Sequence, residues 1–119
     1  MVVDDDPDVR DSVKYALEYY SDYEVICVES GNMCYEMLKN KEIPDLILLD
    51  IMMPGMSGWM VIDRLKENPS WRDIPVVFLT CRTDNFAKEI GIPLCNDYIE
   101  KPFDIVDLKK RINKILKNT

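Results

Sequence analysis

The fold of this chain is decided by one stretch, residues 45–55, with the sequence DLILLDIMMPG. In it an apolar run ends at one carboxylate, Asp50, and a turn signal follows, which is typical of a buried strand in a parallel sheet. The chain opens in the same way, with the apolar residues 1–3 leading into the aspartates Asp4 to Asp6. Because ligands bind at the carboxyl ends of the strands in open α/β sheets, we expect these acids to converge on one site.

Each of the two acidic segments also has a simpler interpretation. Asp50 can merely open a turn, and Asp4 to Asp6 can merely begin a helix. Clustered carboxylates, however, repel one another unless a cation or another positive group lies among them. Two apolar strands that both end in acid therefore favour a charged site over two unrelated turns.

The composition limits the classes of protein to which the chain can belong. Its 119 residues, 47% of them hydrophobic, suit one domain with a real core. The net charge of −7 argues against general affinity for nucleic acid or an anionic membrane, since both need a basic face. No apolar stretch approaches the ~20 residues of a membrane span, and no leader of basic and then apolar residues is visible. We therefore expect a cytoplasmic protein.

The cysteine and histidine content supports this expectation. The four cysteines form no CxxC pair, and the chain has no histidine that could complete a zinc site, so we expect reduced thiols. The absence of histidine also excludes a histidine nucleophile, a His-based triad and a phosphohistidine donor within the chain.

Short β-rich runs alternate along the chain with amphipathic helical patterns. The expected strands are Met1–Asp5, Tyr23–Val28, Asp45–Asp50, Pro75–Thr80 and Asp97–Glu100. The apolar stripes that mark the expected helices are Val9, Val13, Ala16, Leu17 and Tyr20; Met33, Met37 and Leu38; Met60, Val61 and Leu65; Phe86, Ile90 and Ile92; and Ile105, Leu108, Ile112, Ile115 and Leu116. Asp6 as N-cap and Pro7 at the first helical position predict the start of the first helix. This (βα)5 order predicts the α/β class, with a doubly wound parallel sheet covered on both faces by right-handed crossovers.

The carboxyl ends of the expected strands carry polar groups that suit phosphoryl chemistry. These groups are Asp4 and Asp5 after the first strand, Asp50 after the third, Thr80 at the end of the fourth, and Lys101-Pro102 after the fifth. In a parallel sheet these ends point to the same side, so carboxylates, a hydroxyl and an ammonium group meet in one crevice. Carboxylates bind a small hard cation such as Mg²⁺, and lysine adds positive charge toward phosphate. An aspartate can attack phosphorus and form an aspartyl-phosphate.

The motifs that carry this chemistry are VVDDDP (residues 2–7), LLDIMMPGMSG (48–58), VFLT (77–80) and DYIEKPF (97–103). Taken together, they resemble the receiver domain of bacterial and archaeal response regulators, from two-component signalling, over essentially all 119 residues. The resemblance implies the flavodoxin-like form of the fold, a five-stranded parallel sheet with strand order 2-1-3-4-5. It also implies one receiver domain over residues 1–119, either a stand-alone regulator or a piece of a longer response regulator.

The resemblance assigns the metal and phosphate chemistry residue by residue. Asp50 would accept the phosphoryl group. Asp4 and Asp5 would hold Mg²⁺, with Asp50 and the backbone carbonyl of Met52 completing the protein ligands. Helix capping explains Asp6 as well as metal binding does, so Asp6 is not assigned to the site.

The resemblance also implies a switch. Lys101 would contact the phosphoryl group, and Thr80 would bond to it and shift on activation. Tyr98 would swing inward when Thr80 moves, and the peptide bond before Pro102 would be cis. Simpler interpretations stay open for three of these residues: a solvated Lys101, a Thr80 that only ends its strand and a Tyr98 that only packs.

Three positions next to the expected site set this sequence apart. Cys81 follows Thr80 and adds a thiol, where the family usually has another small residue. Met52 and Arg82 lie two places beyond Asp50 and Thr80, at positions that in the family tune the rate of phosphate loss. Because an apolar Met52 cannot orient an attacking water, we expect a fairly long-lived phosphoryl group.

The function that the resemblance implies is a phosphorylation-driven switch, not an enzyme with an external substrate. A sensor histidine kinase or a histidine phosphotransfer protein would donate the phosphoryl group, and the domain would catalyse only its own phosphotransfer and dephosphorylation. The surface around the fourth helix, fifth strand and fifth helix would then contact an output domain, a target protein or a second copy. Neither nucleic acid nor membrane would be bound directly.

The alternative is a phosphatase that resembles the haloacid dehalogenase family, with Asp4 as the nucleophile of an Asp4-x-Asp6 motif. That family needs its nucleophile on the first strand and a late acidic pair for Mg²⁺, whereas the prominent acid at a strand end here is Asp50. A flavin-binding module of the same fold is less favoured, because three aspartates would repel the phosphate of FMN.

Overall fold

The computed structural model describes residues 1–80 and 95–117, except for the side chains of Tyr20 and Thr80. Five strands form one parallel sheet in the order β2-β1-β3-β4-β5. The strands are β1 (Val2–Val3), β2 (Cys27–Val28), β3 (Ile47–Leu49), β4 (Val76–Thr80) and β5 (Asp97–Glu100). The predicted α/β class and the flavodoxin-like strand order are therefore confirmed.

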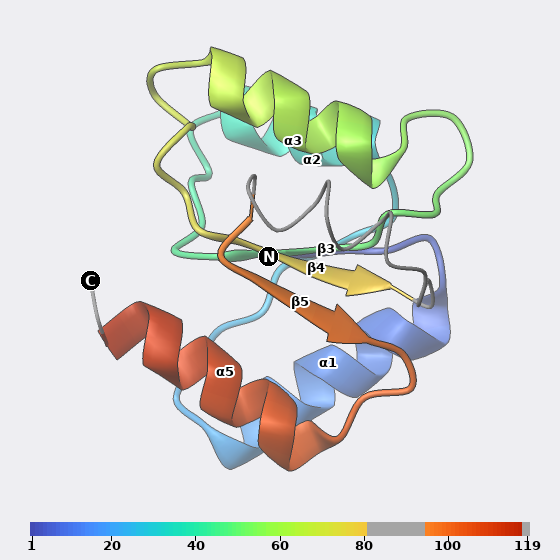
Figure 1. Cartoon of the computed structure of the whole chain (residues 1–119), viewed down its shortest axis with the longest axis vertical. Coiled ribbons are helices and arrows are strands. Elements are labelled where there is room, and N and C mark those ends of the chain that lie inside the picture. The colour runs from blue at the N-terminus through green and yellow to red at the C-terminus, as the bar shows by residue number, and fades with distance from the viewer. Residues whose placement is uncertain (81–94, 118–119) are drawn as a thin grey trace.

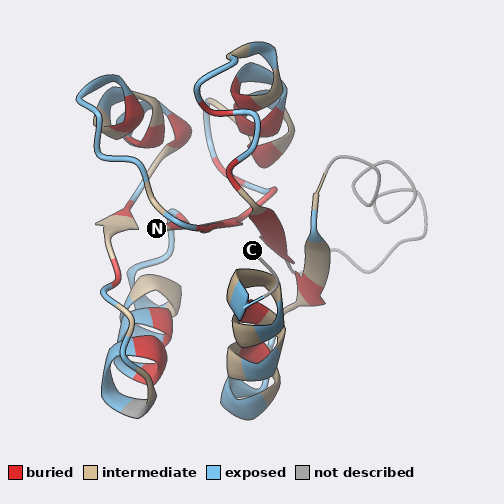
Figure 2. Cartoon of the chain, turned by 90° about the vertical axis from the view of Figure 1, so that its left-hand side faces the viewer, coloured by how far each residue is buried: buried red, intermediate tan, exposed pale blue. Residues whose placement is uncertain are grey.

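Helices cover both faces of this sheet. They are α1 (Pro7–Tyr20), α2 (Gly31–Lys39), α3 (Gly58–Glu67) and α5 (Ile105–Lys117). The pair α2 and α3 lies on one face, whereas α1 and α5 lie on the other (Figure 1). Buried residues gather on the helix sides that face the sheet, so each face has its own core (Figure 2). The helix predicted from Phe86, Ile90 and Ile92 lies outside the described residues.

None of the helices in these two described ranges combines the length and the apolar character that crossing a membrane requires.

Polar side chains cap the first turns of the helices α1, α2 and α3. The Asp8 N–H donates to Asp6 Oδ1 at 2.9 Å, and Pro7 is the first residue of α1, so the predicted start of this helix is confirmed. Ser30 and Ser57 cap α2 and α3 through their hydroxyl groups in the same way.

Four strands are shorter than predicted, and β2 differs most. The prediction of a strand over Tyr23–Val28 is wrong for its first four residues. The Val25 N–H donates to Glu18 Oε2 at 2.9 Å, and Lys14 Nζ donates to the Val25 carbonyl at 3.3 Å. Two side chains of α1, rather than a neighbouring strand, therefore satisfy the backbone of Val25 at this edge of the sheet.

Some residues predicted for the buried helix stripes are exposed. Met33 and Met60 are 43% and 48% exposed, and Ile105 is 37% exposed. The buried residues are Gly31, Cys34 and Leu38 in α2 and Gly58, Val61, Ile62 and Leu65 in α3. These sets repeat at intervals of three and four residues, which return to the same side of a helix. Met33 and Met60 each lie one residue before a buried position, Cys34 and Val61, so they lie on a side of the helix turned away from the sheet.

The start of α3 packs so closely on the end of β3 that glycine is required at position 58. A Cβ there would lie 2.4 Å from the Asp50 carbonyl oxygen and 2.7 Å from Ile51 Cα. The Gly58 N–H also donates to the Ile51 carbonyl at 2.9 Å. The backbone at Asp50 is therefore fixed by the first turn of a helix.

We expect Gly58→Ala to lower the free energy of unfolding by about 2 to 4 kcal/mol, because the added methyl group overlaps backbone atoms. Gly55→Ala is the matched control. The φ angle of Gly55 is +75°, and among the described residues only its chain neighbours approach its Cβ position within 4 Å. Backbone strain of about 1 to 2 kcal/mol is expected there. Urea unfolding compares the two variants, and equal losses would contradict a steric role for position 58.

Candidate functional site

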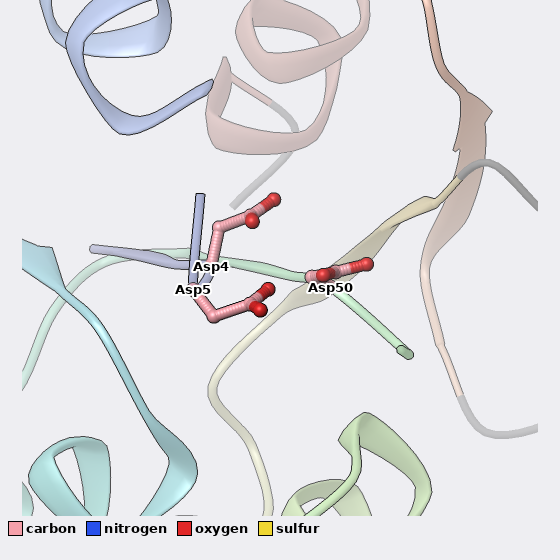
Figure 3. A group of neighbouring side chains, drawn as sticks. All are labelled: Asp4, Asp5 and Asp50. Carbon is pink, nitrogen blue, oxygen red and sulfur yellow. The ribbon is translucent and has the colours of Figure 1, made fainter. Parts of the chain in front are cut away.

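Three carboxylates, from Asp4, Asp5 and Asp50, come together at the carboxyl edge of the sheet (Figure 3). The register of the central strands brings them there. Val3 of β1 pairs with Leu49 of β3, so the next residues, Asp4 and Asp50, leave the sheet side by side. One oxygen from each of the three side chains lies within 4.8 Å of the others. The two acidic segments of the sequence therefore meet in space.

Lys101 reaches this cluster from the far side of β4, because it follows β5 directly. Its Nζ lies 2.7 Å from Asp4 Oδ2 and 3.6 Å from Asp50 Oδ1, and its side chain is 18% exposed. The interpretation of Lys101 as a solvated surface residue is therefore wrong. The peptide bond between Lys101 and Pro102 is cis, as the resemblance implies.

Asp4 is fully buried and is held at three oxygen atoms. The Asp6 N–H donates to Oδ1 at 2.9 Å, and Lys101 donates to Oδ2 at 2.7 Å. Arg10 Nη1 donates to the backbone carbonyl of Asp4 at 2.7 Å. Arg10 was not anticipated from the sequence, although a cation four residues after the N-cap Asp6 is the signal that could have revealed it.

Asp50 is only 3% exposed, and the pKa of its carboxyl is raised from 3.8 to about 6, chiefly by burial. The carboxylate of Asp4 raises this pKa further. Lys101 lowers it, as does the Met52 N–H, which donates to Asp50 Oδ1 at 3.3 Å. Burial together with a specific charged neighbour is the combination found at functional carboxyl groups.

The donor set fits a small, hard divalent cation. Asp4, Asp5 and Asp50 offer only carboxylate oxygens, which are the ligands that Mg²⁺ prefers. Among the described side chains, Lys101 forms ion pairs with two of these carboxylates, and its one positive charge cannot balance three ionised acids. Asp5 is exposed, so a bound cation can also keep water ligands. The acidic cluster therefore suits Mg²⁺.

The other predicted site residues either lie near the acidic cluster without belonging to it or lie outside the described residues. Met52 follows β3, and its side chain is 52% exposed. Tyr98 pairs with Phe78 of β4 and packs against the core on the α2 and α3 face. Thr80 is the last residue of β4. The hydroxyl group of Thr80 and all of Cys81 lie outside the described residues.

Ionisation of Asp50 is expected to destabilise the metal-free chain. Between pH 3.8 and about 6, the folded chain retains a proton on Asp50 that the unfolded chain has released, so the free energy of unfolding falls as pH rises. Asp50→Asn removes this effect. The free energy of unfolding of the variant should therefore be higher than that of the unmodified chain by on the order of 1 to 3 kcal/mol near neutral pH, and equal to it below pH 3.8. Urea unfolding over this pH range, without metal, measures the difference.

The matched control for this experiment is Asp63→Asn, which removes an exposed carboxylate of α3. Its effect should be small and should vary little with pH, because an exposed charge is well solvated. A raised pKa at Asp50 would be contradicted if Asp50→Asn increased the free energy of unfolding near neutral pH by no more than Asp63→Asn does.

Comparisons with known proteins point to one family. The family model of the response regulator receiver domain matches residues 1–113. The phosphate regulon transcriptional regulatory protein PhoB of Escherichia coli is 37% identical over 118 residues, which are 98% of this chain and 51% of PhoB. A probable cyclic di-GMP phosphodiesterase of Vibrio cholerae is 40% identical over 119 residues, 99% of this chain and 26% of that protein. The chain thus spans about half the length, or less, of these curated relatives.

Solved structures agree with the sequence relatives. A response regulator receiver domain protein (CheY-like) from Methanospirillum hungatei is 39% identical, with a TM-score of 0.82 over 100% of this chain and 96% of that one. The alternative of a phosphatase like the haloacid dehalogenases finds no support in these matches. Fold, acidic cluster and relatives lead to the same assignment: the chain belongs to the family of response regulator receiver domains in two-component signalling.

Proposed function

We propose that this receiver domain takes a phosphoryl group onto Asp50. The donor is the phosphohistidine of a sensor histidine kinase or a histidine phosphotransfer protein, because the chain itself contains no histidine. Asp4, Asp5 and Asp50, with the backbone carbonyl of Met52, would hold Mg²⁺. The observation that carries the proposal is a buried Asp50 carboxylate with oxygens of two further carboxylates within 4.8 Å and Lys101 Nζ at 3.6 Å.

Asp50 is the nucleophile in this proposal. Its Oδ1 accepts the Met52 N–H and faces Lys101 Nζ, so we assign the attack on phosphorus to Oδ2. As the bond between Oδ2 and phosphorus forms, the P–N bond of the phosphohistidine breaks, and the leaving imidazole takes up a proton. Only the ionised carboxyl can attack. In the metal-free chain, the raised pKa of Asp50, about 6, keeps much of this carboxyl protonated and unable to attack below that pH.

Charge compensation is the main task of the surrounding residues. The phosphoryl group brings negative charge to a place where three carboxylates already lie. Mg²⁺, which Asp4, Asp5 and Asp50 would hold, would supply positive charge that offsets this repulsion. Lys101 supplies a further positive charge, since its Nζ lies 3.6 Å from Asp50 Oδ1 and could contact an oxygen of a phosphoryl group carried on the neighbouring Oδ2.

The response to phosphorylation would pass through the last strand and helix. Arg111 of α5 donates to Asp97 Oδ1 at 2.9 Å and to the Tyr98 carbonyl at 3.3 Å. It also donates to Asp107 Oδ2 at 3.0 Å within its own helix. These contacts couple α5 to β5, the strand that leads to Lys101. We assign the switch to Thr80 and Tyr98. They would act on the surface formed by β5, α5 and the helix predicted from Phe86, Ile90 and Ile92.

This surface would contact an output domain, a target protein or a second copy of the chain. We propose that residues 1–119 form one receiver domain, alone or within a longer response regulator, in the cytoplasm. It would catalyse only its own phosphorylation and the later loss of that phosphate. It would bind neither nucleic acid nor membrane directly, which agrees with its net charge of −7.

The first test is phosphorylation by a small donor. We expect acetyl phosphate with Mg²⁺ to add one labile phosphoryl group to the chain, and intact-mass analysis measures it. No addition is expected without Mg²⁺, because the carboxylate cluster then repels the donor. None is expected on Asp50→Asn, whereas Asp63→Asn should react normally because this carboxylate lies on the exposed face of α3.

Two outcomes would contradict this assignment. Phosphate that persists on Asp50→Asn would instead indicate that Asp4 is the nucleophile, as in the phosphatase alternative. A folded chain that takes no phosphate at all would indicate a receiver that acts only as a binding scaffold.

The lifetime of the phosphoryl group is expected to depend on Met52. Its side chain is apolar and 52% exposed at the rim of the site, so it cannot hold a water molecule in line for attack. Met52→Asn should speed the loss of phosphate by about tenfold, which corresponds to one hydrogen bond to the attacking water, about 1.4 kcal/mol. The decay of the phosphorylated form, followed by intact mass after donor removal, measures this rate.

Met60→Asn is the matched control, because Met60 is 48% exposed on α3 and undergoes the same chemical change. Its decay rate should equal that of the unmodified chain. An unchanged rate in Met52→Asn would refute the role assigned to this side chain.

A further inference from the structure

We propose that Arg10 is a positioning residue of the Mg²⁺ site and that it acts through the peptide between Asp4 and Asp5. This inference rests on the proposed function, since it concerns the same site. Arg10 lies in α1, where its N–H donates to the Asp6 carbonyl at 3.2 Å. Its side chain folds back, and Nη1 donates to the Asp4 carbonyl at 2.7 Å.

The oxygen that Arg10 holds belongs to the peptide that joins Asp4 to Asp5. Fixing this oxygen fixes the peptide plane, because a peptide unit is rigid. The plane in turn sets the direction in which the next residue, Asp5, leaves the backbone. A charge-assisted hydrogen bond at 2.7 Å is among the stronger contacts that a backbone carbonyl can receive.

Of the three acids, Asp5 is the one whose orientation depends most on the backbone. Asp4 and Asp50 are buried, and their carboxylates are held by Lys101 and by backbone N–H groups. Asp5 is exposed, so water competes for its carboxylate, and the backbone is what directs it toward the other two. A ligand that is oriented in advance loses less conformational entropy when it binds a metal.

The positioning role and a purely electrostatic role predict opposite results. The guanidinium group is always charged, and a positive charge beside the cluster disfavours a second cation. If Arg10 acted only through its charge, its removal would strengthen Mg²⁺ binding. If it acts by fixing the peptide between Asp4 and Asp5, its removal weakens Mg²⁺ binding.

The experiment is titration calorimetry of the full chain with MgCl2. Arg10→Gln should raise the dissociation constant for Mg²⁺ about tenfold, the lower range for loss of a residue that orients a metal ligand. Arg10→Lys keeps the charge and one donor, so it should restore part of the affinity. With acetyl phosphate, the Arg10→Gln variant should need more Mg²⁺ for half-maximal phosphorylation but reach the same maximal rate.

The matched control is Lys14→Gln, which removes a cation one helical turn further along α1. Lys14 Nζ also donates to a backbone carbonyl, that of Val25, at 3.3 Å, but at the edge of the sheet near β2. Its Mg²⁺ affinity should stay within about twofold of the unmodified chain, because Lys14 is solvated and makes no contact with the peptide between Asp4 and Asp5. Urea unfolding of each variant shows that the titrated chains are folded.

Mg²⁺ binding by Arg10→Gln that equals or exceeds that of the unmodified chain would overturn the inference. Equal weakening in Lys14→Gln would also overturn it, because the effect would then belong to α1 in general. An unmodified chain that binds no Mg²⁺ would instead refute the proposed function, and the role of Arg10 with it.

Discussion

The parallel pairing of β1 with β3 is the interaction on which the rest of this structure depends. Val2 pairs with Leu48 and Val3 with Leu49, and these residues are at most 2% exposed. A one-residue shift of register would turn each of these side chains toward the opposite core and disrupt the packing of both, so the pairing is strongly specified. Asp4 and Asp50 follow directly, and their proximity is therefore a consequence of apolar packing rather than of any attraction between them.

That proximity creates a repulsion which the surrounding elements must offset. Lys101 does so in part from the end of β5, which links the charge at the site to three strands of the sheet. Two helices hold the backbone of the acids in place. Gly58 of α3 lies against the Asp50 carbonyl, and Arg10 of α1 donates to the Asp4 carbonyl. A change of charge among these acids would therefore act on a cluster that is held by the backbone and is already repulsive.

The sequence by itself determined the alternation of strands and helices, the acids at two strand ends and the start of α1. These features depend on local patterns: apolar runs that end in a turn, helical periodicity, and the cap formed by Asp6 and Pro7. The motifs also identified the family, and with it the strand order and the expected cis bond before Pro102. Each of these signals is contained within a few neighbouring residues of the chain.

Only the tertiary structure decided how those local elements meet. Met33 and Met60 turned outward because the sheet selects which side of a helix is buried. The segment before β2 left the sheet because Glu18 and Lys14 of α1 bind the backbone of Val25. The donation from Arg10 to Asp4 likewise needs the folded first turn of α1, and Lys101 meets Asp4 across 97 positions of sequence. Apart from Arg10, whose position four residues after the N-cap is a local signal, these contacts join groups whose distance is set by packing, which no local pattern encodes.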